Sequence, residues 1–164
     1  MNVYLKEVST ALLVPAQISP AEQRDMPLMK AGWKFNWNQL FKTKGAMFYK
    51  LTLEVTPGII EAMLMLSIVN GEMVYMNDIE VAPHNYGSNG KYDFAAGCMI
   101  AFACTQAFLK GKGNYAGYLT FESKTELIGL YQNKYGATWA MRNKMFIDPV
   151  AGKRLIEKYL QMGS

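Results

Sequence analysis

Residues 82–97 read APHNYGSNGKYDFAAG, and this segment joins a predicted β-strand to a predicted α-helix. The strand IEVAP ends at Pro83, and the turn that follows is rich in Gly, Asn and Tyr. A helix that begins after such a turn presents its first unpaired N–H groups beyond the end of the strand, together with the positive end of its dipole. The segment therefore predicts a binding site for an anion, and phosphate is the natural ligand.

The residues around the predicted helix start support this interpretation. Ala95, Ala96 and Gly97 are small enough to let a ligand approach the backbone, and Lys91 adds a full positive charge nearby. The alternative is an ordinary loop in which Asp93 caps the helix. A capping carboxylate at Asp93 would disfavour an anion unless its side chain turned away.

The segments that flank this turn predict an α/β fold with a mixed, mostly antiparallel sheet and helices on both faces. Upstream, residues 61–83 form two apolar runs joined at Asn70-Gly71, a strong hairpin signal. Downstream, residues 95–109 are apolar on nearly all sides, which indicates a buried helix that ends at Gly111. Further strands are predicted within residues 3–8, 11–18, 47–55, 115–123 and 137–147.

Capping patterns predict where the other helices begin. Ser19 with Glu22, and Ser123 with Glu126, each have the spacing of a capping box. Asp148 followed by proline predicts the start of a closing helix. Between these, a stripe of large side chains at helical spacing indicates core or the wall of a groove; its members are Trp33, Trp37, Leu40 and Phe41.

The second strand of the hairpin carries two carboxylates. Strict alternation places Asp78 and Glu80 on the same face as Val74 and Met76, with residues 73, 75, 79 and 81 on the other face. Two neighbouring carboxylates beside apolar side chains are expected to have raised pKa values, which suits a general base. A solvent-facing position for either carboxylate is the alternative.

Length and composition limit the function classes. The 164 residues are enough for one domain, and the net charge of +4 with a pI near 9.0 comes from dispersed cations, so direct nucleic-acid binding is not expected. Cys98 and Cys104 are six residues apart and cannot pair on one helix, which indicates reduced thiols and a cytoplasmic protein. No apolar signal core or run of about 20 apolar residues indicates a membrane segment.

From about Leu12 to Leu160, the order strand, glycine turn, buried helix, strand and helix resembles the GNAT superfamily of N-acetyltransferases. In that superfamily the turn reads Arg/Gln-x-x-Gly-x-Gly/Ala, and its amides bind the pyrophosphate of acetyl-CoA. Lys91, Phe94 and Ala96 stand at these positions, within KYDFAAG. Phe94 departs from the pattern because it replaces the first Gly.

A second motif lies further along the chain. Leu130-Tyr131, followed by Gly136-Ala137, is similar to the superfamily ending Leu/Phe-Tyr-x-x-x-Gly-Phe. The resemblance implies that Tyr131 protonates the thiolate of coenzyme A as it leaves, and a packed tyrosine is the alternative. It also implies contacts with acetyl-CoA at Val81, Ala82, Lys91, Tyr92, Phe94, Ala95, Ala96, Gly97 and Tyr131.

The implied reaction is direct transfer of an acetyl group from acetyl-CoA to an amine, with no metal. Glu80, Asp78 or a relay of water molecules would take the proton of the amine, and the backbone amide near Val81 would stabilise the oxyanion. His84, the only histidine, is a minor candidate.

The acceptor stays open at this point: a small amine, a peptide or lysine amine, or aminoacyl-tRNA. The rival hypothesis is a GNAT-fold module that binds acyl-CoA or a protein without turnover. The sequence is compatible with a homodimer.

Overall fold

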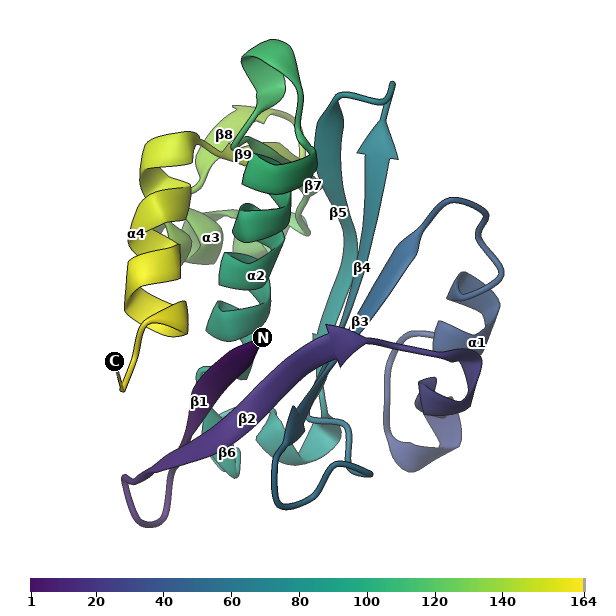
Figure 1. Cartoon of the computed structure of the whole chain (residues 1–164), viewed down its shortest axis with the longest axis vertical. Coiled ribbons are helices and arrows are strands. Elements are labelled where there is room, and N and C mark those ends of the chain that lie inside the picture. The colour runs from purple at the N-terminus through teal and green to yellow at the C-terminus, as the bar shows by residue number, and fades with distance from the viewer. Residues whose placement is uncertain (164) are drawn as a thin grey trace.

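The computed structural model describes residues 1–163, and its central feature is a twisted sheet of nine strands (Figure 1). The spatial order is β6-β1-β2-β3-β4-β5-β7-β9-β8, and only β5 and β7 pair in parallel. The strands are β1 Asn2–Glu7, β2 Leu13–Pro20, β3 Met47–Leu53, β4 Ala62–Val69, β5 Met73–Val81, β6 Tyr92–Asp93, β7 Leu119–Glu122, β8 Thr138–Met141 and β9 Lys144–Ile147. The predicted mixed, mostly antiparallel sheet is confirmed.

Helices cover both faces of this sheet, as the sequence predicts. The buried helix α2 (Ala95–Lys110) and the closing helix α4 (Pro149–Leu160) pack on one face and on each other (Figure 1). The short helix α1 (Trp37–Leu40) lies on the opposite face, and α3 (Ile128–Tyr135) follows β7. Two clusters of buried side chains fill these two layers, and the larger lies under α2 and α4.

The hairpin at Asn70-Gly71 is confirmed, but β5 contains a bulge that alternation along the sequence could not reveal. Met65 of β4 pairs with Asp78, while the next residue, Leu66, pairs with Met76, so Asn77 is an extra residue in β5. The extra residue shifts the alternation by one position. The prediction that Val74 and Met76 share a face with Asp78 and Glu80 is therefore wrong.

Beyond the bulge, Ile79 and Val81 join Val74 and Met76 on the α2 side of the sheet. Asp78 and Glu80 pair with Met65 and Met63, which belong to the cluster on the α1 side. The bulge thus aims the two carboxylates away from the large core.

Two of the predicted helix caps are wrong. Ser19 lies in β2 and pairs with Lys50 of β3, so its backbone is extended and cannot cap a helix. The first turn after it is the 3-10 turn η1 (Gln23–Asp25), whose N-cap is Glu22. Ser123 donates its N–H to the carbonyl of Asn143 at the end of the sheet, and α3 begins five residues later, after the 3-10 turn η5 (Thr125–Leu127).

The other predicted helix boundaries are confirmed. Asp148 caps α4 by accepting a hydrogen bond from the N–H of Ala151 at 2.8 Å. Gly136 ends α3 with a φ of 67°, a left-handed conformation that favours glycine. Gly111 ends α2.

The stripe of large side chains near residue 37 packs as core, although only one helical turn forms there. Trp33 and Trp37 are buried, and Leu40 and Phe41 pack against them. Asn36 caps this turn through its side chain, which accepts from the N–H of Gln39. The segment before it holds only the 3-10 turn η2 (Met29–Ala31).

Both cysteines are buried free thiols, and burial raises the pKa of Cys98 and of Cys104 to about 12. None of the helices found in residues 1–163 has the length and apolar character needed to cross a bilayer.

Candidate active site

β5 and β7 separate at the point where the bulge begins. The two parallel strands pair only from Val74 with Leu119 to Met76 with Phe121. Below this register β5 continues to Val81, whereas β7 ends at Glu122. The lower half of β5 therefore has a side that β7 does not cover.

Val81 faces this uncovered side with its backbone. Ala82 donates its N–H to the carbonyl of Glu61 at 2.9 Å, so Ala82 bonds toward β4. Hydrogen-bonded and non-hydrogen-bonded pairs alternate along an antiparallel ladder, so the N–H and C=O of Val81 point the other way, toward the gap next to β7. Ala82 itself is buried and its N–H is already occupied.

The N-terminus of α2 follows β5 along the chain, after the loop and short strand of residues 82–93, and α2 packs against both β5 and β7. Its N-cap residue is Phe94, with a φ of 80° and a ψ of 0°, and no side chain caps the helix. Asp93 instead belongs to β6 and pairs with Lys6, so the alternative in which Asp93 caps the helix is wrong. A φ of 80° at a residue with a Cβ is strained, and it is the conformation that glycine adopts easily.

A cavity of ≈ 230 Å³ lies at this helix mouth. Phe94, Ala96 and Gly97 line it, as expected of a site built on the start of α2. Its other lining residues come from the preceding strand, from the end of α3 and from the end of α4: Asp93, Lys134, Tyr135, Lys158 and Tyr159. The two ammonium groups, together with the uncapped helix, make the mouth suited to an anion.

Lys134 and Lys158 were missed by sequence reasoning. Lys134 follows Tyr131 by three residues in LYQNKYGA, which is a local signal, but nothing in the sequence brings the end of α4 to the start of α2. Lys91, the predicted cation, is exposed and lies with its Nζ 5.4 Å from the centre of the Tyr92 ring. It is outside the set of residues that line the cavity.

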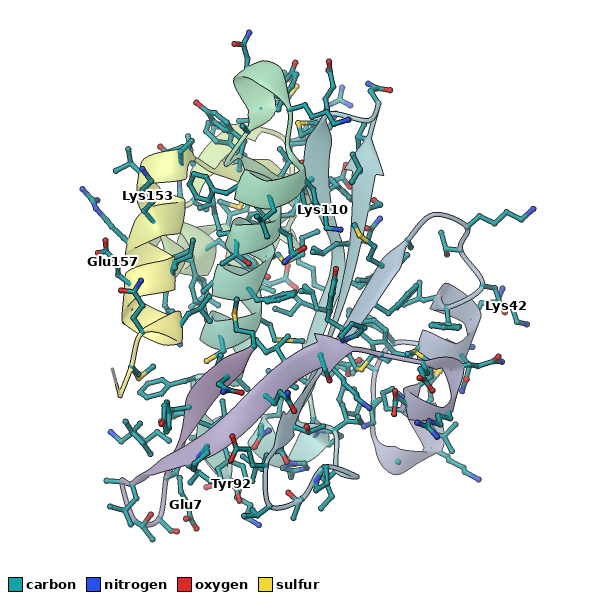
Figure 2. The ribbon with its side chains drawn as sticks, viewed as in Figure 1. Glu7, Lys42, Tyr92, Lys110, Lys153 and Glu157 are labelled. Carbon is teal, nitrogen blue, oxygen red and sulfur yellow. The ribbon has the colours of Figure 1, made fainter. Side chains whose placement is uncertain are left out.

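Tyr92, Ala95 and Gly97, three of the residues predicted to contact acetyl-CoA, also make contacts within the protein. The N–H of Tyr92 donates to Asn85 Oδ1 at 3.1 Å, and Tyr92 pairs with Glu7 in the sheet (Figure 2). Ala95 is buried in the large core. A Cβ on Gly97 would overlap the ring of Tyr159, so this glycine admits α4 to the surface of α2.

Asp78 and Glu80 have different surroundings although they share one face of β5. Glu80 is 9% exposed, and its carboxylate accepts from the N–H of Lys34 (2.6 Å), the N–H of Phe35 (3.2 Å) and Nε1 of Trp37 (2.9 Å). Asp78 is half-buried, and burial, followed by the negative charge of Glu80, raises its pKa above the ordinary value. A raised pKa is the property expected of a general base.

Tyr131 lies on α3 beside β7. Its ring contacts the rings of Phe121 (4.8 Å between centroids) and Tyr135 (5.9 Å). Burial raises the pKa of the Tyr131 phenol, so the hydroxyl keeps its proton at neutral pH. Because Phe121 is the last residue of β7 that pairs with β5, this contact holds Tyr131 near the point where the two strands separate.

His84 does not stand free in the loop, since its Nε2 lies 2.6 Å from Oε1 of the buried Glu61. No group of three or more His, Cys, Asp or Glu side chains within residues 1–163 is arranged to hold a metal ion.

Comparisons with known proteins bear on the fold. No family model and no curated protein matches the sequence. Among solved structures, the chain is similar to a KacTA–DNA complex, with a TM-score of 0.63 and 12% identity over 87% of this chain and 99% of that chain. It is also similar to AtaTR bound with acetyl-CoA, with a TM-score of 0.62 and 15% identity over 86% and 98% of the two chains. A third is a variant of the spermidine N-acetyltransferase SpeG from Vibrio cholerae, with a TM-score of 0.59 and 12% identity over 84% and 95%.

This chain has the strand order, the bulge in β5 and the gap between β5 and β7 described above. It aligns with nearly the whole length of these structures. The protein therefore has the fold of the GNAT superfamily of N-acetyltransferases, as the sequence predicts.

Proposed function

We propose that this protein is an N-acetyltransferase that uses acetyl-CoA as its acetyl donor and an amine as its acceptor. The observation that carries the proposal is the uncapped mouth of α2, a helix that packs on β5 and β7, the two strands that separate beyond Met76 and Phe121. The mouth of α2 suits a diphosphate, and the uncovered side of β5 suits an extended thioester arm. Together these two features match the two chemical ends of one coenzyme.

The residues present fit this coenzyme. The first N–H groups of α2 would bind the pyrophosphate, and Lys134 and Lys158 would supply positive charge beside it. The N–H of Val81 would donate to the thioester carbonyl as negative charge develops on its oxygen. Bound acetyl-CoA supplies the activated acetyl group.

The remaining roles concern protons. We assign the base to Asp78 in preference to Glu80, because three N–H donors already occupy the Glu80 carboxylate. Asp78 would remove a proton from the amine directly or through water. Tyr131 would deliver a proton to the coenzyme sulfur as the acetyl group leaves it.

The acceptor is an amine whose class stays open among small amines, peptide amines and aminoacyl-tRNA. The spermidine acetyltransferase fold relative is consistent with a small amine. The KacTA fold relative is found in a complex with DNA. For this chain, dispersed cations favour an acceptor that is not itself a nucleic acid, and a gel-shift assay at two salt concentrations tests this.

The experiment that tests the proposal is calorimetric titration with acetyl-CoA, followed by a thiol-release assay over polyamines, peptide N-termini, lysine peptides and aminoacyl-tRNA. Binding together with thiol release for at least one amine class is the expected result. A protein that binds no acetyl-CoA would overturn both the enzyme and the acyl-CoA-binding alternative.

The alternative is a module on this fold that binds acyl-CoA without turnover, and one observation favours it. Phe94 holds the left-handed position at the helix mouth where the superfamily pattern has glycine. Its ring lies 6.1 Å from that of Tyr159, on the wall of the cavity. Tight binding of acetyl-CoA with no thiol release for any amine class would support this module.

A further inference from the structure

A buried carboxylate lies at the start of β4, and the mechanism above does not use it. Glu61 is 1% exposed. Its Oε1 lies 2.6 Å from Nε2 of His84 and accepts a hydrogen bond from Nδ2 of Asn85 at 2.9 Å. Both partners follow β5 directly, in the loop of residues 83–92 that leads to the mouth of α2.

The backbone of Glu61 is fixed by the sheet. Its N–H donates to the carbonyl of Leu51 at 2.7 Å, and its carbonyl accepts from the N–H of Ala82 at 2.9 Å and from Nδ2 of Asn85 at 3.2 Å. The backbone that carries the carboxylate is therefore held in place by the sheet. The side chains of His84 and Asn85, which contact the carboxylate, are held in place with it.

The same network reaches the far end of the loop. Asn85 Oδ1 accepts from the N–H of Tyr92 at 3.1 Å, and His84 O accepts from the N–H of Lys91 at 2.8 Å. Tyr92 is only two residues before Phe94, the N-cap of α2. Glu61 thus connects the first and last residues of the loop to one point in the sheet.

Burying a carboxylate is energetically less favourable than burying an apolar side chain of the same size. Removing a charged carboxylate from water costs free energy unless hydrogen bonds compensate for it. His84 and Asn85 provide that compensation, and His84 is 40% exposed on its outer side. An apolar side chain could fill the same volume, but it could not fix the direction of two loop side chains.

We propose that Glu61 is a positioning residue for the coenzyme: through His84 and Asn85 it holds the 83–92 loop in the conformation that presents the mouth of α2. This inference rests on the proposed function, because acetyl-CoA is the ligand whose binding it improves. A loop that is ordered before binding does not have to lose conformational freedom when the ligand arrives, and this raises affinity.

The test uses two substitutions at the contact between Glu61 and Asn85. Glu61→Gln removes the charge. Asn85→Asp keeps the acceptor for Tyr92 but replaces the amide donor with a second carboxylate against Glu61. We expect each change to raise the Kd for acetyl-CoA about 10-fold. The double variant restores a donor facing an acceptor between the two side chains, but the carbonyl of residue 61 still lacks the bond from Asn85 Nδ2, so its Kd should be at least about threefold lower than that of either single variant.

Kinetics and a matched control separate positioning from general loss of structure. The KM for acetyl-CoA should rise about 10-fold in each single variant, while kcat and the acceptor KM change less than about twofold. Glu54→Gln makes the same chemical change at an exposed site on the connection before β4, and it should leave every value unchanged. Unchanged Kd values in both single variants, or a double variant no tighter than either, would overturn the proposal.

Hydrogen exchange gives a readout that does not depend on coenzyme. The amides of Lys91 and Tyr92 should exchange faster in both single variants than in the unmodified protein, and the double variant should recover protection. Unchanged exchange would overturn the positioning role even if acetyl transfer is demonstrated. If the protein binds no acetyl-CoA but exchange changes as expected, the proposed function fails while the Glu61 anchor stands.

Discussion

Glu80 Oε1 accepts a hydrogen bond of 2.9 Å from the indole Nε1 of Trp37, and this contact ties β5 to the short helix α1. Trp37 is fully buried and Glu80 is nearly so. Two backbone N–H groups, from Lys34 and Phe35, bind the same carboxylate. The arrangement explains how a segment with one helical turn keeps a defined position on the sheet.

Glu80→Gln tests this anchor. A carboxamide would place its NH₂ group against one of the three donors and leave that donor unpaired. We expect the free energy of unfolding to fall by about 2–3 kcal/mol in urea denaturation. Glu157→Gln, on the outward side of α4 (Figure 2), is the control and should change it by less than about 0.5 kcal/mol. An equal, small effect of both changes would contradict the anchoring role.

Asp78→Asn should act in the opposite direction on stability. Burial, and then the charge of Glu80, raises the pKa of Asp78 above its value in the unfolded chain. The ionised carboxylate therefore destabilises the folded state once the pH exceeds the unfolded pKa of about 3.9. We expect Asp78→Asn to be more stable than the unmodified protein at pH 7, with the difference disappearing near pH 3.

Activity supplies the second readout for Asp78. If Asp78 is the base, Asp78→Asn should lower kcat about 100-fold or more, and the acid limb of the pH–rate profile should be lost. A variant that is more stable but equally active would leave a water relay as the base.

The contrast between these two carboxylates shows where sequence reasoning succeeded and where it could not. The hairpin was predictable because Asn70-Gly71 is a local signal, and so was the face that Asp78 and Glu80 share. Their apolar neighbours were not predictable, because alternation assumes that each residue of β5 has one partner in β4. Asn77 has none, and a single extra residue moved Val74 and Met76 to the other side.

The candidate active site also contains residues that the sequence could predict and residues that it could not. The small residues at the mouth of α2 were predictable from one continuous segment. Lys158 and Tyr159 were not, because they reach that mouth only through the packing of α4 on α2, more than fifty residues later in the chain. Glu61 gave no sequence signal either, since one acidic residue before an apolar strand is common in loops.

Tyr131→Phe separates chemistry from packing on α3. The phenylalanine keeps the ring contact with Phe121, so stability should change little. Loss of the hydroxyl should lower kcat about 100-fold while the Kd for acetyl-CoA stays within about twofold. Because burial raises the pKa of the phenol, no loss of rate from its ionisation is expected below about pH 10. An unchanged rate would show that Tyr131 only packs.

Gly97→Ala tests how α4 is held against α2. A Cβ at this position would overlap the ring of the buried Tyr159, so the ring or the two helices would have to shift. We expect a loss of about 1–3 kcal/mol in the free energy of unfolding. Gly129→Ala is the matched control: this glycine lies on α3 with open space around it, and alanine there should add up to about 1 kcal/mol. A stabilising effect of both changes would contradict the close packing at Gly97.

Lys158→Ala and Lys134→Ala test which cations bind the coenzyme phosphates. Each should raise the Kd for acetyl-CoA about fivefold at low salt, and the effect should shrink at 1 M salt, where the Debye length is about 3 Å. Lys153→Ala is the control, because Lys153 lies on the same helix as Lys158 (Figure 2) but its ammonium lies near the ring of Phe108, and it is outside the cavity lining. Lys91→Ala should have a smaller effect than either cavity lysine, since Lys91 lies beside the ring of Tyr92 and outside the cavity lining. If Lys91→Ala weakened binding most, the phosphates would lie along the loop and not at the mouth of α2.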